Sequence, residues 1–92
     1  MKRISRRDRL KIYGDLLGIL SAESRNQKVV ISHIQLQLNV PLDRLRKYIL
    51  ELEKLGLIED KQSLMLSEKG KEYIREYKKV LEFIKRMGLV YQ

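Results

Sequence analysis

Residues 41–58, PLDRLRKYILELEKLGLI, carry the pattern that decides the fold. Pro41 suits the first turn of an α-helix, where its missing N–H costs no hydrogen bond. Gly56 suits the end, where glycine adopts a left-handed conformation most cheaply. Between them, apolar side chains recur at three- and four-residue steps and so share one helix face: Leu42, Leu45, Ile49, Leu52 and Leu55. We therefore predict an amphipathic helix that begins at Pro41 and stops at Gly56.

The polar side of this helix is basic at its N-terminal end. Arg44, Arg46 and Lys47 point away from the apolar stripe and fall in the first two turns. A helix that enters the major groove of DNA by its N-terminal end needs such a distribution. A solvated helix face would explain the same three residues equally well, so the neighbouring elements must decide.

The composition excludes several classes of protein. With 92 residues the chain is one small domain. It has no cysteine and a single histidine, so a disulfide framework, a thiolate metal site and a histidine relay are not expected. The chain has no run of about 18 apolar residues, which is the length needed to span a membrane. The opening MKRISRRDR is not followed by the apolar core of a signal peptide, so a cytoplasmic protein is expected.

The positive charge is concentrated at the two ends of the chain. The net charge is +8, of which residues 1–11 contribute +5 from six bases and one acid. Clustered positive charge attracts polyanions. We interpret the N-terminal bases as an arm that binds phosphate, although a solvated tail or a membrane-surface segment would have the same composition: Lys2, Arg3, Arg6, Arg7, Arg9 and Lys11.

Two helices are predicted before Pro41. The first runs from about residue 6 to 22, capped by Ser5 with Asp8 three positions on. Gly14 and Gly18 lie four residues apart inside it, which indicates close approach of another helix. After a polar loop, Val29-Val30-Ile31 is assigned to one short edge strand.

A short helix then follows, over about residues 33–38. Ser32 is its predicted cap, with Gln35 completing a capping box. Asn39 is the predicted stop, and Val40 packs inward. This helix therefore joins the one at Pro41 through about three residues, which is the spacing of a helix-turn-helix.

A hairpin and a long helix complete the chain. Residues 57–59 and 64–66 are the two predicted strands, with a polar turn at 60–63. Ser67 caps the last helix, residues 68–86, and Gly88 ends it. The predicted fold is mainly α with a small β-hairpin wing, a winged helix-turn-helix over residues 1–67 plus a long C-terminal helix within 68–92.

Two motifs carry a family resemblance: Leu45-x-x-Tyr48-Ile49-x-x-Leu52-x-x-x-Gly56-Leu57-Ile58, and then Leu66-Ser67-Glu68-Lys69-Gly70. They resemble the archaeal winged helix-turn-helix family that includes small chromosomal DNA-binding proteins and related transcription regulators. The resemblance implies duplex DNA binding, with the helix from Pro41 as recognition helix. It implies that Arg44, Arg46 and Lys47 face the groove and that Lys61, at the wing tip, contacts phosphate. It also implies that His33 and Gln35 touch the DNA backbone.

The same resemblance implies a homodimer joined through the last helix as an antiparallel coiled coil. That helix carries an apolar stripe that a lone small domain would leave partly exposed. The expected dimer contacts are Ile74, Tyr77, Val80, Leu81, Ile84 and Met87. The alternative is that the helix folds back on the first helix, where Gly14 and Gly18 would allow close packing.

No catalytic constellation accompanies these elements. Carboxylate pairs such as Glu59 and Asp60 have no positioned base, nucleophile or glycine-rich phosphate loop beside them. We expect no enzyme, no cofactor and no small-molecule ligand. The leading hypothesis is a transcription regulator or architectural chromosomal protein that binds duplex DNA. A winged-helix protein-interaction module is the alternative. RNA binding is a third and less supported hypothesis, because no aromatic stacking platform is evident.

Overall fold

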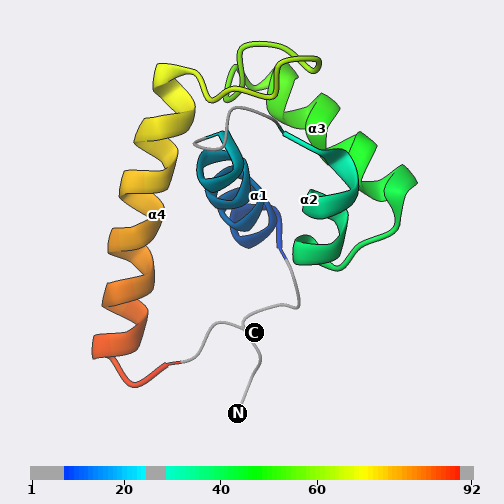
Figure 1. Ribbon diagram of the computed structural model, residues 1–92. Coiled ribbons are helices and arrows are strands. Elements are labelled where there is room, and N and C mark those ends of the chain that lie inside the picture. Colours follow the sequence, from blue (N-terminus) through cyan, green and yellow to red (C-terminus); the bar gives the residue numbers. More distant parts are fainter. Residues whose placement is uncertain (1–7, 25–28, 90–92) are drawn as a thin grey trace.

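The computed structural model describes residues 8–24 and 29–89 and is mainly helical within them. Its helices are α1 (Arg9–Ser24), α2 (Ile31–Leu38), α3 (Leu42–Lys54) and α4 (Glu68–Arg86). Figure 1 shows α1 in the centre, with α4 along one side and the α2–α3 pair on the other. None of the described helices is both long and apolar enough to cross a membrane.

The first helix begins later than the sequence pattern predicted. α1 starts at Arg9, not at residue 6, because Asp8 forms the cap. The Asp8 carboxylate accepts a hydrogen bond from the Lys11 backbone N–H at 2.9 Å, and the Asp8 carbonyl accepts one from the Ile12 N–H at 3.0 Å. Asp8 therefore has the capping role that the sequence pattern predicts for Ser5, which lies outside the described residues.

The predicted edge strand at residues 29–31 is wrong. Ile31 already opens α2, and the cap is Val30, in an extended conformation and without a side-chain cap bond. Ser32 is therefore an exposed residue of the first turn and not the N-cap. Ile31 packs against the core from this turn, so tertiary packing outweighs the β preference of the Val-Val-Ile run.

The turn between α2 and α3 agrees with the prediction. Asn39 adopts a left-handed conformation, with φ 58°, and its N–H donates to the Gln35 carbonyl. Val40 is buried beneath the turn. Pro41 has extended backbone angles and is the N-cap, so α3 begins one residue later than expected. Gly56, with φ 76°, follows α3 as predicted.

The two-stranded hairpin is not confirmed. Within the described part of the chain, the segment between α3 and α4 pairs through one antiparallel bridge, Ile58 with Leu66. A backbone hydrogen bond of 2.8 Å from the Glu59 N–H to the Met65 carbonyl accompanies it. The Asp60 carboxylate accepts bonds from the N–H groups of Gln62 and Ser63 and so closes the turn. Those bonds lower the pKa of Asp60.

The helix α4 packs against α1 along its first half. Ser67 caps it, its hydroxyl oxygen accepting from the Gly70 N–H at 3.1 Å. The Tyr77 ring lies against Gly14, where an added Cβ would stand 2.4 Å from the ring. Gly18 has no such neighbour within 4 Å. The fold-back packing thus occurs, and it uses only one of the two glycines.

The core joins all four helices to the segment after α3. Its fully buried members come from α1, α2 and α3: Leu16, Leu17, Leu20, Ile34, Leu45 and Leu52. Leu57, Ile58, Leu64 and Leu66 add the bridged segment to the same cluster. Leu55, predicted on the apolar stripe, is exposed at the end of α3. The core therefore holds α3 rigidly by its apolar face and leaves its polar face to solvent.

Candidate nucleic-acid interface

The exposed side of α3 is the feature that the tertiary structure presents most clearly. Arg44, Arg46 and Lys47 are all exposed, whereas Leu45 between them is fully buried. Asp43 lies in the first turn, where a carboxylate is favoured by the positive helix end. The three bases are therefore held at the N-terminal half of a helix that cannot rotate without exposing Leu45.

A shallow groove joins α3 to the turn after it. Its volume is about 310 Å³, and its lining includes Arg46, Leu50 and Lys61. The structure thus brings Arg46 and Lys61 to one groove, although they are 15 positions apart in the sequence. The Lys61 N–H donates to the Glu53 carboxylate at 2.9 Å, which ties this turn to the second half of α3. Glu59 and Asp60 are exposed beside Lys61 and reduce its local positive potential.

Arg9 has a structural role that the sequence did not reveal. Its Nε lies 3.3 Å from a Glu51 carboxylate oxygen, and its guanidinium stacks 5.2 Å from the centre of the Tyr48 ring. The Tyr13 hydroxyl donates to the same Glu51 oxygen at 2.5 Å. Burial, and then this hydrogen bond, raise the pKa of Tyr13 to about 12. These four side chains join α1 to α3 and fix the position of α3.

The other N-terminal bases divide into two groups. Lys11 pairs with Asp15 at 2.7 Å, one helical turn away. Lys2, Arg3, Arg6 and Arg7 lie outside the described residues, so the phosphate-binding arm stays a prediction for them.

The predicted backbone contacts on α2 have ordinary positions. His33 is exposed in the first turn of α2, and Gln35 is half-buried. The Gln35 carbonyl accepts the hydrogen bond that closes the turn at Asn39. Their contact with DNA stays a prediction.

The predicted dimer residues separate into a packed and an exposed set. Tyr77 is buried against α1 and Ile74 is half-buried there. Val80 and Ile84 are half-buried, whereas Leu81 and Met87 are exposed. Phe83, 51 % exposed, was not predicted because it falls outside the three–four spacing of the stripe. The second half of α4 and the residues after it therefore present four exposed apolar side chains: Leu81, Phe83, Met87 and Leu89.

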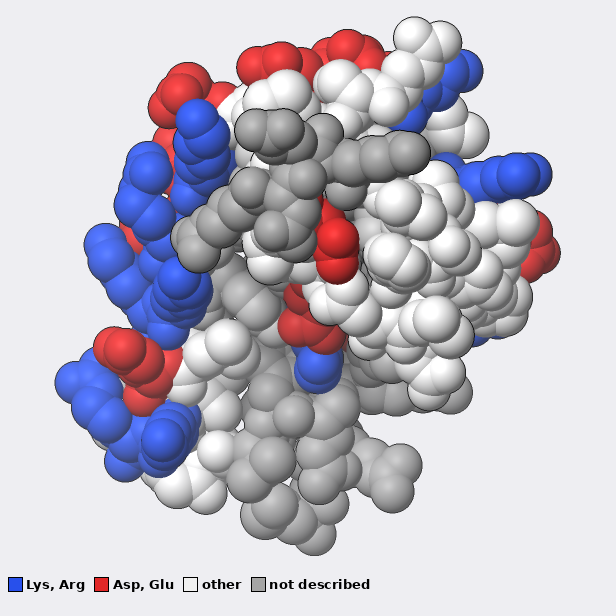
Figure 2. Space-filling model, in the orientation of Figure 1, with Lys and Arg blue, Asp and Glu red and all other residues white. Residues whose placement is uncertain are grey.

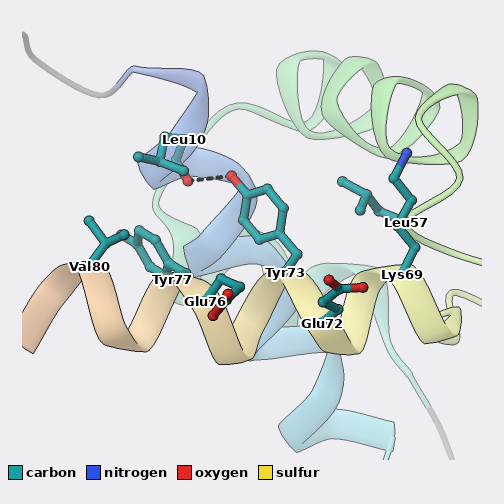
Figure 3. Close-up of a pocket in the computed structure, with 8 residues that line it drawn as sticks. All are labelled: Leu10, Leu57, Lys69, Glu72, Tyr73, Glu76, Tyr77 and Val80. Carbon is teal, nitrogen blue, oxygen red and sulfur yellow. Dashed lines mark hydrogen bonds between the residues drawn. The ribbon is translucent and has the colours of Figure 1, made fainter.

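A second groove, of about 320 Å³, runs between α4 and the start of α1. Figure 3 shows Tyr73 and Tyr77 pointing from α4 towards α1, with the Tyr73 hydroxyl donating to the Leu10 carbonyl at 2.8 Å. Val80 extends this apolar lining along α4. Glu72 and Glu76 stand on its rim, so this groove is unsuited to a phosphate backbone.

Figure 2 shows where charge gathers on one face of the molecule. Lys and Arg side chains gather along the outer side of α4, with acidic side chains between them towards its C-terminal end, and further acidic side chains lie near the end where α4 begins. This basic surface is separate from the one on α3, because α1 lies between the two helices (Figure 1).

One comparison with known proteins identifies a family. A family model described as winged helix-turn-helix matches residues 6–85, which include all four helices. No curated protein and no solved structure matches the chain.

Proposed function

Because the chain belongs to the winged helix-turn-helix family, we propose that it binds duplex DNA with α3 as the recognition helix. Domains of this family are typically DNA-binding and not enzymatic. The observation that supports the proposal is the exposure of Arg44, Arg46 and Lys47 on the N-terminal half of a helix whose opposite face is buried. Guanidinium groups bind both phosphate and the edge of guanine well.

The neighbouring groups suit the docking of this helix. The N-terminal half of α3 enters the major groove of the DNA. Arg46 and Lys61, which line one groove of the protein, contact the phosphates along the edge of that major groove. The Arg9–Glu51–Tyr13 contacts hold α3 at a fixed angle to α1. Arg3, Arg6 and Arg7 add an arm that follows the backbone, and His33 and Gln35 contact it from the start of α2.

The protein acts as a homodimer in this proposal. The exposed apolar residues at the end of α4 support this: Leu81 and Phe83 in the helix, with Met87 and Leu89 after it. Ile74, Tyr77, Val80 and Ile84 back this surface or border it. Pairing two copies covers the apolar surface and presents two recognition helices to one duplex. The biological role is that of a transcription regulator or an architectural chromosomal protein, in the cytoplasm and associated with the nucleoid.

A salt titration on duplex DNA tests the proposal. Neutralising about five phosphates gives a log–log slope of affinity against salt on the order of −4 to −5. Arg44→Ala and Arg46→Ala should make the slope shallower, each by about 0.9 if the residue contacts one phosphate. Lys54→Ala, at the other end of α3, is the matched control and should leave the slope unchanged. Absence of duplex binding at low salt would leave the protein-interaction module as the better account.

Sedimentation velocity tests the homodimer. A dimer at micromolar concentration is expected for the wild type, and Leu81→Glu with Met87→Glu should yield a folded monomer because both side chains are exposed within one protomer. A wild-type monomer at that concentration would contradict this part of the proposal.

A further inference from the structure

The outer side of α4 carries a row of Lys and Arg side chains that take no part in the proposed contacts of α3 with DNA. Lys71, Arg75, Lys78 and Lys85 follow helical spacing, and Lys79 and Arg86 flank them. All six are exposed. We call these six side chains the α4 basic stripe. Glu68 at its start, Glu82 within it and Glu76, which pairs with Lys79, are the carboxylates on or beside it, so the stripe retains a net charge of +3, six basic residues less three acidic ones.

Most of the stripe is not neutralised by the protein itself. Lys71 lies 3.4 Å from Glu68 and Lys79 lies 3.0 Å from Glu76. Within residues 8–24 and 29–89, the remaining four bases make no ion pair: Arg75, Lys78, Lys85 and Arg86. Four Lys and Arg side chains without an ion pair, held on one helix, create a positive electrostatic potential that attracts a polyanion.

The shape of the stripe fits the backbone of a nucleic-acid duplex. Lys71 and Lys85 are 14 residues apart, which is about 21 Å along an α-helix at about 1.5 Å per residue. This length equals about six phosphates of one strand, at about 3.4 Å of duplex axis each.

The stripe faces away from the proposed recognition helix. Tyr77, on the opposite side of α4, packs against α1, and α1 separates α4 from α3 (Figure 1). Figure 2 shows the bases of α4 along the outer edge of the molecule in that same view. One duplex lying along α3 therefore cannot also follow the outer side of α4 unless the duplex bends sharply, which is energetically unfavourable.

We propose that the α4 basic stripe is a second binding surface for the phosphate backbone of duplex DNA, by which the protein joins two duplexes. The bridging, though not the binding by the stripe, rests on the proposed function of α3. An anionic membrane is a poorer partner, because a helix lying on a membrane inserts its apolar face, and the first half of that face in α4 is already packed on α1.

A capture experiment with three full-length variants tests this proposal. A short duplex is fixed to beads, the protein is added, and capture of a second, fluorescent duplex is measured together with affinity for the first. The stripe-neutral variant is Arg75→Gln, Lys78→Gln and Lys85→Gln, which breaks no ion pair. Its matched control keeps the charge at the same positions: Arg75→Lys, Lys78→Arg and Lys85→Arg. The α3-neutral variant is Arg44→Gln with Arg46→Gln.

We expect the stripe-neutral variant to keep its affinity for the fixed duplex within about threefold and to lose capture of the second duplex by about tenfold or more at low salt, since three phosphate contacts are removed. The charge-keeping control should capture as the wild type does. Unchanged capture by the stripe-neutral variant would overturn the proposal. Bridging would then come from another surface, such as the two α3 helices of a dimer. Loss of affinity for the fixed duplex would also overturn bridging, because the stripe would then contact the same duplex as α3.

The same variants separate failure of the two proposals. If the α3-neutral variant binds normally while the stripe-neutral variant does not, α3 is not the recognition helix and the stripe is the main site. If the stripe-neutral variant is impaired only in binding vesicles of mixed phosphatidylserine and phosphatidylcholine, the stripe is a membrane surface and the present inference is wrong.

Discussion

The contact between Gly14 and Tyr77 gives a prediction in which the chain supplies its own control. A Cβ at Gly14 would lie 2.4 Å from two carbon atoms of the Tyr77 ring. Carbon atoms in good contact are about 3.5–4.0 Å apart, so the ring would have to retreat by about 1 Å. Gly18 is one turn further along α1 and has nothing within 4 Å of the same position. Alanine should therefore destabilise the fold at Gly14 and be tolerated at Gly18.

The magnitudes follow from two opposing effects. Replacing glycine by alanine inside a helix stabilises it by up to about 1 kcal/mol at either site. At Gly14 the overpacking against Tyr77 costs about 1–3 kcal/mol in addition. Gly18→Ala should thus raise the free energy of unfolding by up to about 1 kcal/mol, and Gly14→Ala should lie about 1–3 kcal/mol below it. Because the helix preference of alanine is the same at both sites, it cancels in this difference. The difference in unfolding free energy then measures only the cost of the contact with Tyr77.

Urea unfolding followed by circular dichroism at the helix band measures both variants. A cycle with Tyr77→Leu tests the cause, because removing the ring should make Gly14→Ala behave like Gly18→Ala. Equal free energies for the two alanine variants in the wild-type background would refute the packing of Tyr77 on Gly14.

Three further predictions concern the stability of the fold. Leu52→Ala should lower the free energy of unfolding by about 2–5 kcal/mol, because it leaves a cavity, whereas the exposed Arg46→Ala should change it by less than about 0.5 kcal/mol in the same urea measurement. Stability should fall as the pH rises from about 10 to 12, because the native state holds the Tyr13 proton, at a pKa of about 12 against an ordinary 10.0, more tightly than the unfolded chain does. Tyr13→Phe should weaken that alkaline fall in the urea midpoint. Asn39→Ala should lower the thermal midpoint and Asn39→Gly should not, because the left-handed backbone there costs a residue with a Cβ about 1 kcal/mol or more.

The sequence by itself determined the elements whose signals are local. The apolar stripe of α3 predicted its buried face, Asn39 predicted the end of α2, and Gly56 predicted the left-handed residue that follows α3. Ser67 predicted the cap of α4. These features depend on residues within a turn or two, so spacing and side-chain chemistry were sufficient. The exposure of Arg44 followed from the same periodicity.

Tertiary structure decided the remaining features, because they depend on contacts between residues far apart in the chain. The run at residues 29–31 has a strand composition, yet the packing of Ile31 on the core makes it the start of α2. Arg9 belongs by composition to the basic N-terminal segment, but Glu51 and Tyr48 on α3 hold it in place. Gly14 and Gly18 look alike in the sequence, and only the position of the Tyr77 ring distinguishes them. Helical periodicity fixes the face on which a side chain lies, but its neighbour is fixed only when the helices pack together.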